Sequence, residues 1–164
     1  MDNPVVVHVA RALAAAGLAA LRFNFGGAGA SEGAYGQGRE EQRDVAAATV
    51  ALAARIPEGS PLAIAGYSFG AWVGTLAAQE LPRVARVVAV APPLAFFAWE
   101  LGPRLRQPLD VVVGDRDQYC PADALERFVA AYDVRAEVIP GADHFLDGLE
   151  ARVAAAVVRL VGGA

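Results

Sequence analysis

Two kinds of segment alternate along this chain. Short apolar runs rich in valine, isoleucine and leucine are typical of buried strands, and the stretches between them carry apolar residues at helical spacing. The expected strands are residues 18–25, 62–67, 84–91, 109–113 and 135–139. The expected helices are residues 4–16, 39–55, 71–81, 122–132 and 145–161.

The first of these helices is the most ambiguous segment. Its three consecutive valines, residues 5–7, favour a strand, because β-branched residues prefer strands. However, Asp2 or Asn3 can cap a helix whose first position is Pro4, and alanines follow as far as residue 16. We therefore favour a helix that stops at Gly17.

Strands that are apolar on both faces and alternate with helices indicate a parallel sheet covered on two sides. The sequence thus predicts an α/β fold, a mostly parallel sheet of about five strands with helices on both faces. A length of 164 residues suits one domain over residues 1–164, and the chain shows neither a repeat nor a linker.

Composition and charge exclude several classes of function. All 14 basic residues are arginines, so a catalytic lysine and a phosphate-binding P-loop lysine are both absent. The arginines form no basic tract and the net charge is -4, which argues against nucleic-acid binding. No apolar run approaches the roughly 18 residues of a membrane helix. Without a basic N-terminal stretch a signal peptide is not expected, so we predict a cytoplasmic protein that does not bind membranes.

The pentapeptide Gly66-Tyr67-Ser68-Phe69-Gly70 carries the clearest chemical signal. It follows an expected strand and precedes an expected helix, which is the context of a nucleophile elbow. We expect glycines on both sides of Ser68 because the turn is too tight for larger residues. The helix N-terminus would direct partial positive charge at a developing oxyanion. A glycine-rich turn with an incidental serine is the alternative.

A serine nucleophile needs a base and an acid. Of the two histidines, His144 follows the last expected strand, at the edge where an open sheet presents functional residues, whereas His8 lies on the first helix. After the strand at 109–113, Asp115 and Asp117 are both candidates for the acid. We favour Asp117, which lies further out on the loop, and Asp115 remains as a residue that braces the turn.

These residues together resemble the α/β-hydrolase superfamily, in particular the small lidless bacterial esterase-like proteins related to dienelactone hydrolases. The segments 21–33, 66–71 and 141–145 carry the resemblance, which covers nearly the whole chain. It implies that Ser68 is the nucleophile, Asp117 the acid and His144 the base. It also implies that the backbone N–H of Phe69 is one oxyanion-hole donor.

The chain also departs from that subfamily. Its members usually begin with three further strands, and the loop after the third normally supplies a second oxyanion donor. A backbone N–H near Gly26 or Gly27 is a candidate substitute. Without the third strand, residues 18–25 would pair with 62–67 or leave an open edge. Because an open strand edge invites pairing, we expect a homodimer.

Other motifs have weaker readings. The glycines at 27, 29 and 33 miss the spacing of a dinucleotide-binding loop by one residue, and no helix follows them directly. The aromatic segment 92–99 either lines a pocket near Ser68 or packs on the sheet. We expect Cys120 to be inert, because no histidine other than the proposed base His144 is placed to activate it. We predict no cofactor and no metal site.

The sequence therefore predicts a serine hydrolase that cleaves small, soluble carboxylic esters through Ser68, Asp117 and His144. A thioesterase or an acyltransferase would use the same residues. The alternative from another class is a weakly active or non-catalytic protein of the same fold with a binding or assembly role.

Overall fold

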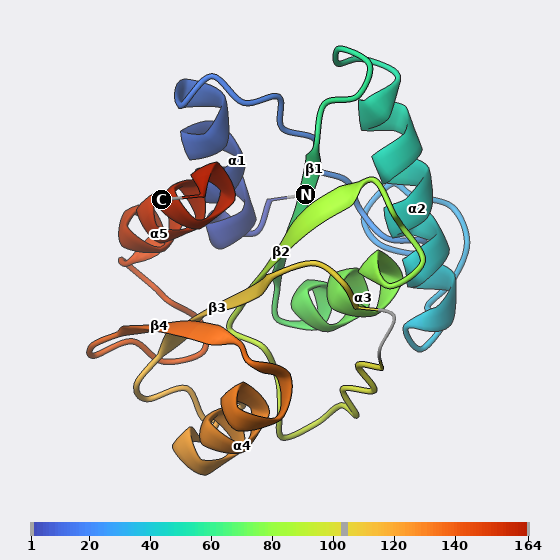
Figure 1. Ribbon diagram of the computed structural model, residues 1–164. Helices are drawn as coiled ribbons and strands as arrows, with labels where there is room; N and C mark the ends of the chain where they lie inside the picture. Colours follow the sequence, from blue (N-terminus) through green and yellow to red (C-terminus); the bar gives the residue numbers. More distant parts are fainter. Residues whose placement is uncertain (1, 103–104, 164) are drawn as a thin grey trace.

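The computed structural model describes residues 2–102 and 105–163, and within them it contains one parallel sheet. Its strands lie in the order β1-β2-β3-β4, each hydrogen-bonded in parallel to the next (Figure 1). The strands are β1 (Leu62–Tyr67), β2 (Val84–Val90), β3 (Leu109–Gly114) and β4 (Arg135–Ile139). The predicted α/β fold is confirmed, with four strands in this sheet instead of five.

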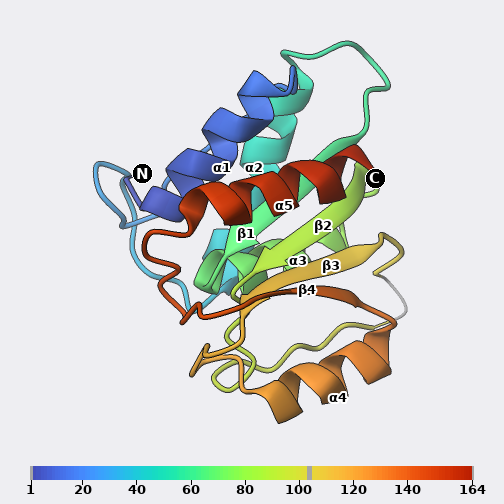
Figure 2. The same ribbon diagram turned by 90° about the vertical axis from the view of Figure 1, so that its left-hand side faces the viewer.

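The described residues form five helices, which lie on the two sides of the sheet (Figure 2). They are α1 (Pro4–Ala15), α2 (Arg39–Ala53), α3 (Phe69–Ala78), α4 (Ala122–Tyr132) and α5 (Glu150–Gly162). Helices α1 and α5 pack together on one face over Val88, Val90 and Val112. Helices α3 and α4 cover the other face over Val87 and Val111, and α2 packs outside α3. Alternate residues of each strand thus enter two separate cores.

The first segment is a helix, as predicted, because its cap outweighs the strand preference of its valines. The side chain of Asn3 accepts a hydrogen bond from the N–H of Val6 at 3.2 Å, and Pro4 occupies the first helical position. Val5 and Val9, one helical turn apart, are buried in the core that α1 shares with α5. Burial of these two valines on one face adds to the effect of the cap and stabilises the helix.

Residues 18–25 are the main correction to the predicted fold. They form no strand: the segment is irregular and has no ladder with β1. A cavity of about 440 Å³ lies between this segment and β1. Phe23 and Phe25 line it on one side and β1 on the other, and it extends to Ser68. Leu18 and Leu21 are 40% and 42% exposed. The sequence of this segment is suited to a strand, but it lacks a strand partner.

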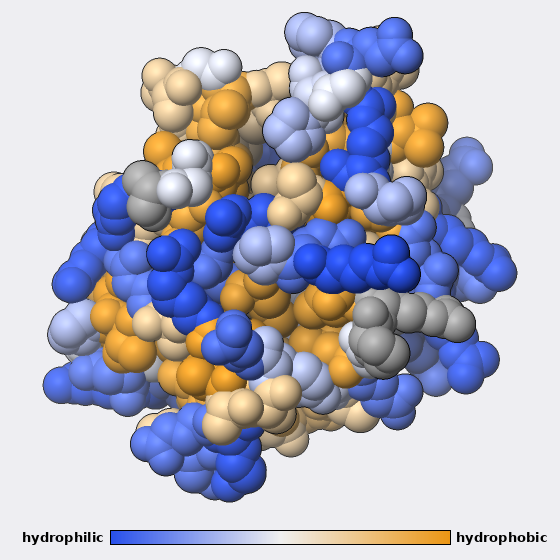
Figure 3. Space-filling view, in the orientation of Figure 1, coloured by the Kyte–Doolittle hydropathy of each residue, from blue (hydrophilic) through white to orange (hydrophobic). Residues whose placement is uncertain are grey.

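The outer edge of β1 is consequently open in the part of the chain that the structure describes. The N–H groups of Leu62 and Ser68 bond to carbonyls at the two ends of β2, so residues of even number face β2. The backbone groups of Ala63 and Ala65 point the other way, and both residues are exposed. Apolar side chains also reach the surface over α1 (Figure 3). The expected homodimer stays a prediction.

The start of α5 is a second correction. The helix begins at Glu150, five residues later than the expected start at 145. Leu146 and Gly148 have φ angles of 59° and 74°, which are outside the helical region, and the Leu146 side chain is fully buried. The need to bury Leu146 beneath the loop takes precedence over local helix propensity.

At the end of the sheet away from the strand carboxyl ends, a buried carboxylate joins three strands. Asp110 on β3 pairs with Arg86 on β2 at 2.6 Å and with Arg135 on β4 at 2.9 Å. The Asp110 side chain is 5% exposed. Its two partners satisfy a charge that would otherwise destabilise the sheet.

Glu41 holds the glycine-rich loop onto the start of α2. Its carboxylate is 1% exposed and accepts the N–H groups of Gly36 and Gly38, each at 2.8 Å. Burial alone would raise the pKa of Glu41, but these bonds and one from its own N–H outweigh burial and leave the pKa below the usual value. The carboxylate is thus more stable in the folded chain than in the unfolded one.

Substitution of this carboxylate tests its role in stability. We expect Glu41→Gln to lower the free energy of unfolding by about 1–3 kcal/mol, because one buried N–H loses a charged acceptor. The neighbouring Glu40→Gln, at an exposed ion pair with Arg43, is the control and should cost at most about 0.5 kcal/mol. Urea unfolding at pH 7 measures both.

The contribution of Glu41 to stability should change with pH in a definite direction. Because the folded pKa lies below the unfolded value of 4.5, the advantage of the wild type over Glu41→Gln is complete above pH 4.5. It should decline as the pH falls through the folded pKa. An advantage that is unchanged, or that grows, at acid pH would contradict this account.

Candidate active site

Ser68 sits on a sharp turn between β1 and α3, as the pentapeptide predicts. Its φ and ψ are 52° and -119°, a conformation that non-glycine residues rarely adopt. The Ser68 N–H donates to the carbonyl of Val90 at 2.9 Å, and its own carbonyl accepts the N–H of Ala71 at 2.9 Å. The strand on one side and the helix on the other therefore hold the strained residue in place.

The two flanking glycines have different roles. A Cβ on Gly66 would overlap the backbone of Gly70 and lie 2.7 Å from the Cα of Ala71, so glycine is required there. A Cβ on Gly70 would meet only Phe25, at 4.0 Å. The expectation that tight packing requires glycine on both sides therefore holds only for Gly66.

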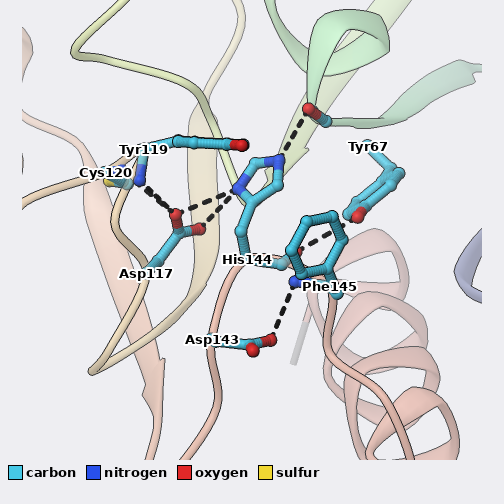
Figure 4. A network of polar contacts seen from close by, with 8 residues as sticks. Tyr67, Asp117, Tyr119, Cys120, Asp143, His144 and Phe145 are labelled. Carbon is cyan, nitrogen blue, oxygen red and sulfur yellow. Dashed lines mark hydrogen bonds and ion pairs between the residues drawn. The ribbon is translucent and has the colours of Figure 1, made fainter.

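Three of the predicted site residues lie in one hydrogen-bonded row, drawn in Figure 4. The Oγ of Ser68 is 2.8 Å from Nε2 of His144, and Nδ1 of His144 is 3.0 Å from both carboxylate oxygens of Asp117. His144 and Asp117 are 3% and 4% exposed. With Nδ1–H donating to Asp117, Nε2 is free to accept the Ser68 proton.

Asp117 is held by its own loop. Its Oδ1 accepts the N–H groups of Tyr119 at 2.8 Å and Cys120 at 3.1 Å. Asp115, the other candidate, instead accepts the N–H of Gly141 at 2.7 Å, and so braces the loop that carries His144. The two aspartates thus have separate positions, and only Asp117 reaches the imidazole.

Two further groups near this row have displaced pKa values. Burial, with a contribution from Asp117, raises the pKa of the Cys120 thiol to about 12. The thiol therefore stays protonated at neutral pH and is a poor nucleophile. Tyr67 donates its hydroxyl to the His144 carbonyl at 3.1 Å. Burial, together with Asp117, Asp147 and Asp143, raises the pKa of Tyr67 to about 12. Sequence reasoning did not identify this tyrosine contact, because it links residues 77 positions apart.

The backbone N–H of Phe69, the predicted oxyanion donor, lies at the start of a helix. Phe69 is the first residue of α3, so its N–H has no partner within the helix. The suggested second donors are engaged elsewhere: Gly26 N–H donates to Asp44 at 2.8 Å, and Gly27 N–H donates to the Glu32 carbonyl at 3.1 Å. The source of a second donor near Gly26 or Gly27 therefore stays a prediction.

The aromatic segment after β2 divides between the two roles considered for it. Phe97 stacks on Trp72 with ring centroids 4.3 Å apart, and Trp99 is buried against Phe128. Phe96 instead contacts Tyr119, whose ring lies 4.4 Å from His144. Phe97 and Trp99 therefore pack against other parts of the fold, while Phe96 contacts a residue that lies beside His144.

The structure offers no sign of a metal centre or a membrane span in its described residues. No group of three or more histidine, cysteine, aspartate or glutamate side chains is arranged to hold a metal ion there. Likewise, none of the helices in the described ranges is long and apolar enough to cross a membrane.

Comparison with known proteins agrees with the fold. Residues 1–155 match the family described as alpha/beta hydrolase domain. This chain therefore belongs to the α/β-hydrolase family. It is 29% identical over 155 residues to an uncharacterized protein of Rickettsia prowazekii, an alignment that covers 88% of this chain and 65% of the other. The chain thus spans less than two thirds of that relative's length.

Two solved structures show the same architecture. An α/β serine hydrolase homologue from Coxiella burnetii is 32% identical with a TM-score of 0.87, covering 98% of this chain and 77% of its own. An α/β serine hydrolase without a lid from Xanthomonas campestris is 29% identical with a TM-score of 0.88, covering 99% of this chain and 74% of its own. The predicted resemblance to small lidless hydrolases is confirmed.

The glycine geometry gives a direct test of the turn. We expect Gly66→Ala to destabilise the fold by about 1–3 kcal/mol, because its Cβ would force the turn to open. Gly70→Ala should change stability by less than about 1 kcal/mol, since its Cβ has room. Thermal unfolding of the two variants checks this, and equal losses would contradict the described packing.

Proposed function

We propose that this protein is a serine hydrolase that cleaves small carboxylic esters. The observation that carries the proposal is the row from Ser68 through His144 to Asp117 on a strained strand-to-helix turn. Each of the three groups has the partner that its role requires, and the imidazole and carboxylate are buried, where water does not compete for their hydrogen bonds.

The proposed reaction has two halves. In the first, Nε2 of His144 takes the proton of Ser68 as Oγ attacks the acyl carbonyl. The Phe69 N–H donates to the oxyanion, and the imidazolium, stabilised by Asp117, returns the proton to the departing alcohol. In the second, a water molecule is deprotonated by His144, attacks the acyl-enzyme and releases the acid. The cavity of about 440 Å³ beside Ser68 gives a short acyl group room.

The oxyanion site also supports an alternative, a weakly active or non-catalytic protein with a binding role. Of the three N–H groups considered, those of Gly26 and Gly27 have other partners, and that of Phe69 has none within its helix. Loss of one donor costs about a hundredfold or more in rate. We therefore expect slow turnover relative to hydrolases with two donors. A thioesterase or acyltransferase would use the same three residues.

Hydrolysis of p-nitrophenyl acetate and butyrate tests the proposal. We expect turnover by the purified chain, and a loss of more than about a thousandfold in Ser68→Ala, because no other group then acts as nucleophile. Ser60→Ala, which removes a hydroxyl from the loop before β1, is the matched control and should retain full activity. A fluorophosphonate probe should label the wild type and Ser60→Ala but not Ser68→Ala.

The outcomes are distinct. Labelling at Ser68 without turnover would favour the weakly active or binding alternative. Turnover or labelling that survives Ser68→Ala would exclude Ser68 as the nucleophile and overturn the proposal.

A further inference from the structure

Tyr119 and Phe145 lie beside His144, and Phe96 packs on Tyr119. We call these three aromatic side chains, which come from three different loops, the aromatic rim. Phe96 follows β2, Tyr119 follows β3 and Phe145 follows β4. Phe96 and Phe145 are 64% and 51% exposed, whereas Tyr119 is partly buried beneath them. Figure 4 shows Tyr119 and Phe145 beside the imidazole. The carboxyl ends of the strands therefore bring apolar rings from distant parts of the chain to one place.

The contacts within the rim are those of a defined surface. The Tyr119 ring lies 4.4 Å from the His144 ring, and Phe96 meets Tyr119 edge to face at 4.9 Å. Phe145 lies 5.8 Å from His144 and 6.5 Å from Tyr119. The N–H of Ala95 donates to the Tyr119 carbonyl at 3.0 Å and ties the first two loops together. The rim is therefore held in a fixed position relative to the catalytic row.

The exposed rings of the rim are not explained by packing of the core. The other phenylalanine of the same loop, Phe97, is half-buried and stacked on Trp72 at 4.3 Å. Phe96, its neighbour, leaves most of its surface in water. Large apolar groups gathered at the surface beside a reactive residue are typical of a binding site.

The chemistry of the reaction decides which part of a substrate meets the rim. His144 must return its proton to the oxygen of the departing alcohol, so that oxygen lies within hydrogen-bond reach of Nε2. The acyl carbon is bound to Ser68, on the side of Phe69 and of the cavity along β1. The carbon skeleton of the alcohol therefore extends on the side of His144, where the rim lies.

We propose that the aromatic rim binds the alcohol part of the ester, and that the preferred substrates are esters of neutral aromatic alcohols of the benzyl type. This inference rests on the proposed ester hydrolysis. The perpendicular arrangement of Phe96 and Tyr119 leaves ring surface on which a planar group can pack. The carboxylate of Asp143, which accepts the N–H of Phe145 at 2.9 Å, disfavours an anionic alcohol at this position.

Benzyl acetate and ethyl acetate test the proposal, because they share one acyl group and differ in the alcohol. We expect the wild type to hydrolyse benzyl acetate with a kcat/KM about tenfold higher or more. Phe96→Ala and Phe145→Ala should each reduce that ratio about three- to tenfold, while kcat/KM for ethyl acetate changes less than about twofold. Both side chains are exposed, so their truncation leaves the core intact.

The matched control is Tyr35→Ala, which removes an aromatic side chain of similar exposure, 65%, that packs on Phe69 and is not part of the rim. It should leave the benzyl-to-ethyl ratio unchanged. A general disturbance of the catalytic row would lower both rates together and leave the ratio constant. An unchanged ratio in Phe96→Ala and Phe145→Ala, or a wild type without benzyl preference, overturns the inference while ester hydrolysis itself stands.

A second measurement tests binding at the rim in the absence of turnover. In saturation-transfer NMR with Ser68→Ala protein, the ring protons of benzyl acetate should receive saturation from the protein. The signal should weaken at least about threefold when Phe96→Ala is added, but not when Tyr35→Ala is added. Equal signals in all three proteins overturn the inference. Absence of hydrolysis and of fluorophosphonate labelling in the wild type would instead overturn the proposed function.

Discussion

The close backbone contact between the end of β3 and the loop after β4 determines the geometry of the site. Gly114 lies so near the carbonyl of Ala142 that any Cβ would overlap it, and the N–H of Arg116 donates to the same carbonyl at 2.9 Å. The carboxylate of Asp115 also holds this loop, because it accepts a hydrogen bond from the N–H of Gly141. Asp117 and His144 each lie a few residues beyond this contact, which brings Nδ1 of His144 to 3.0 Å from the Asp117 carboxylate.

Ser68 joins this pair through the parallel ladder. The hydrogen bond from its N–H to Val90 continues the β1–β2 register by one residue past the end of the strand, and so carries the turn to the same edge of the sheet. The strain of its φ of 52° is offset by the strand and helix on either side. Three residues that are far apart in sequence thus occupy one site because parallel strands end together.

Much of this arrangement was predictable from sequence. The strands β1 and β4 and helix α4 have the predicted bounds, because β-branched runs, proline and a clear amphipathic pattern mark them locally. Ser68, Asp117 and His144 each follow a predicted strand, and the ends of parallel strands determine where such side chains lie. What they do in catalysis stays a prediction.

The remaining features depend on partners that a local pattern does not contain. Residues 18–25 have the composition of a strand, but a strand exists only where a neighbour offers hydrogen bonds. The late start of α5 follows from burial of Leu146, and the N–H of Gly26 bonds to Asp44, 18 residues away. Each depends on tertiary contacts, which spacing alone does not specify.

The alternation of backbone directions in β1 has a consequence for hydrogen exchange. Amide hydrogens of Ile64 and Gly66 are directed at β2 and share the protection of the sheet, whereas those of Ala63 and Ala65 face the open edge. One strand therefore carries two interleaved sets of amides whose exchange rates differ widely without any local unfolding. Protection of the odd-numbered set would report directly that another polypeptide has joined the sheet.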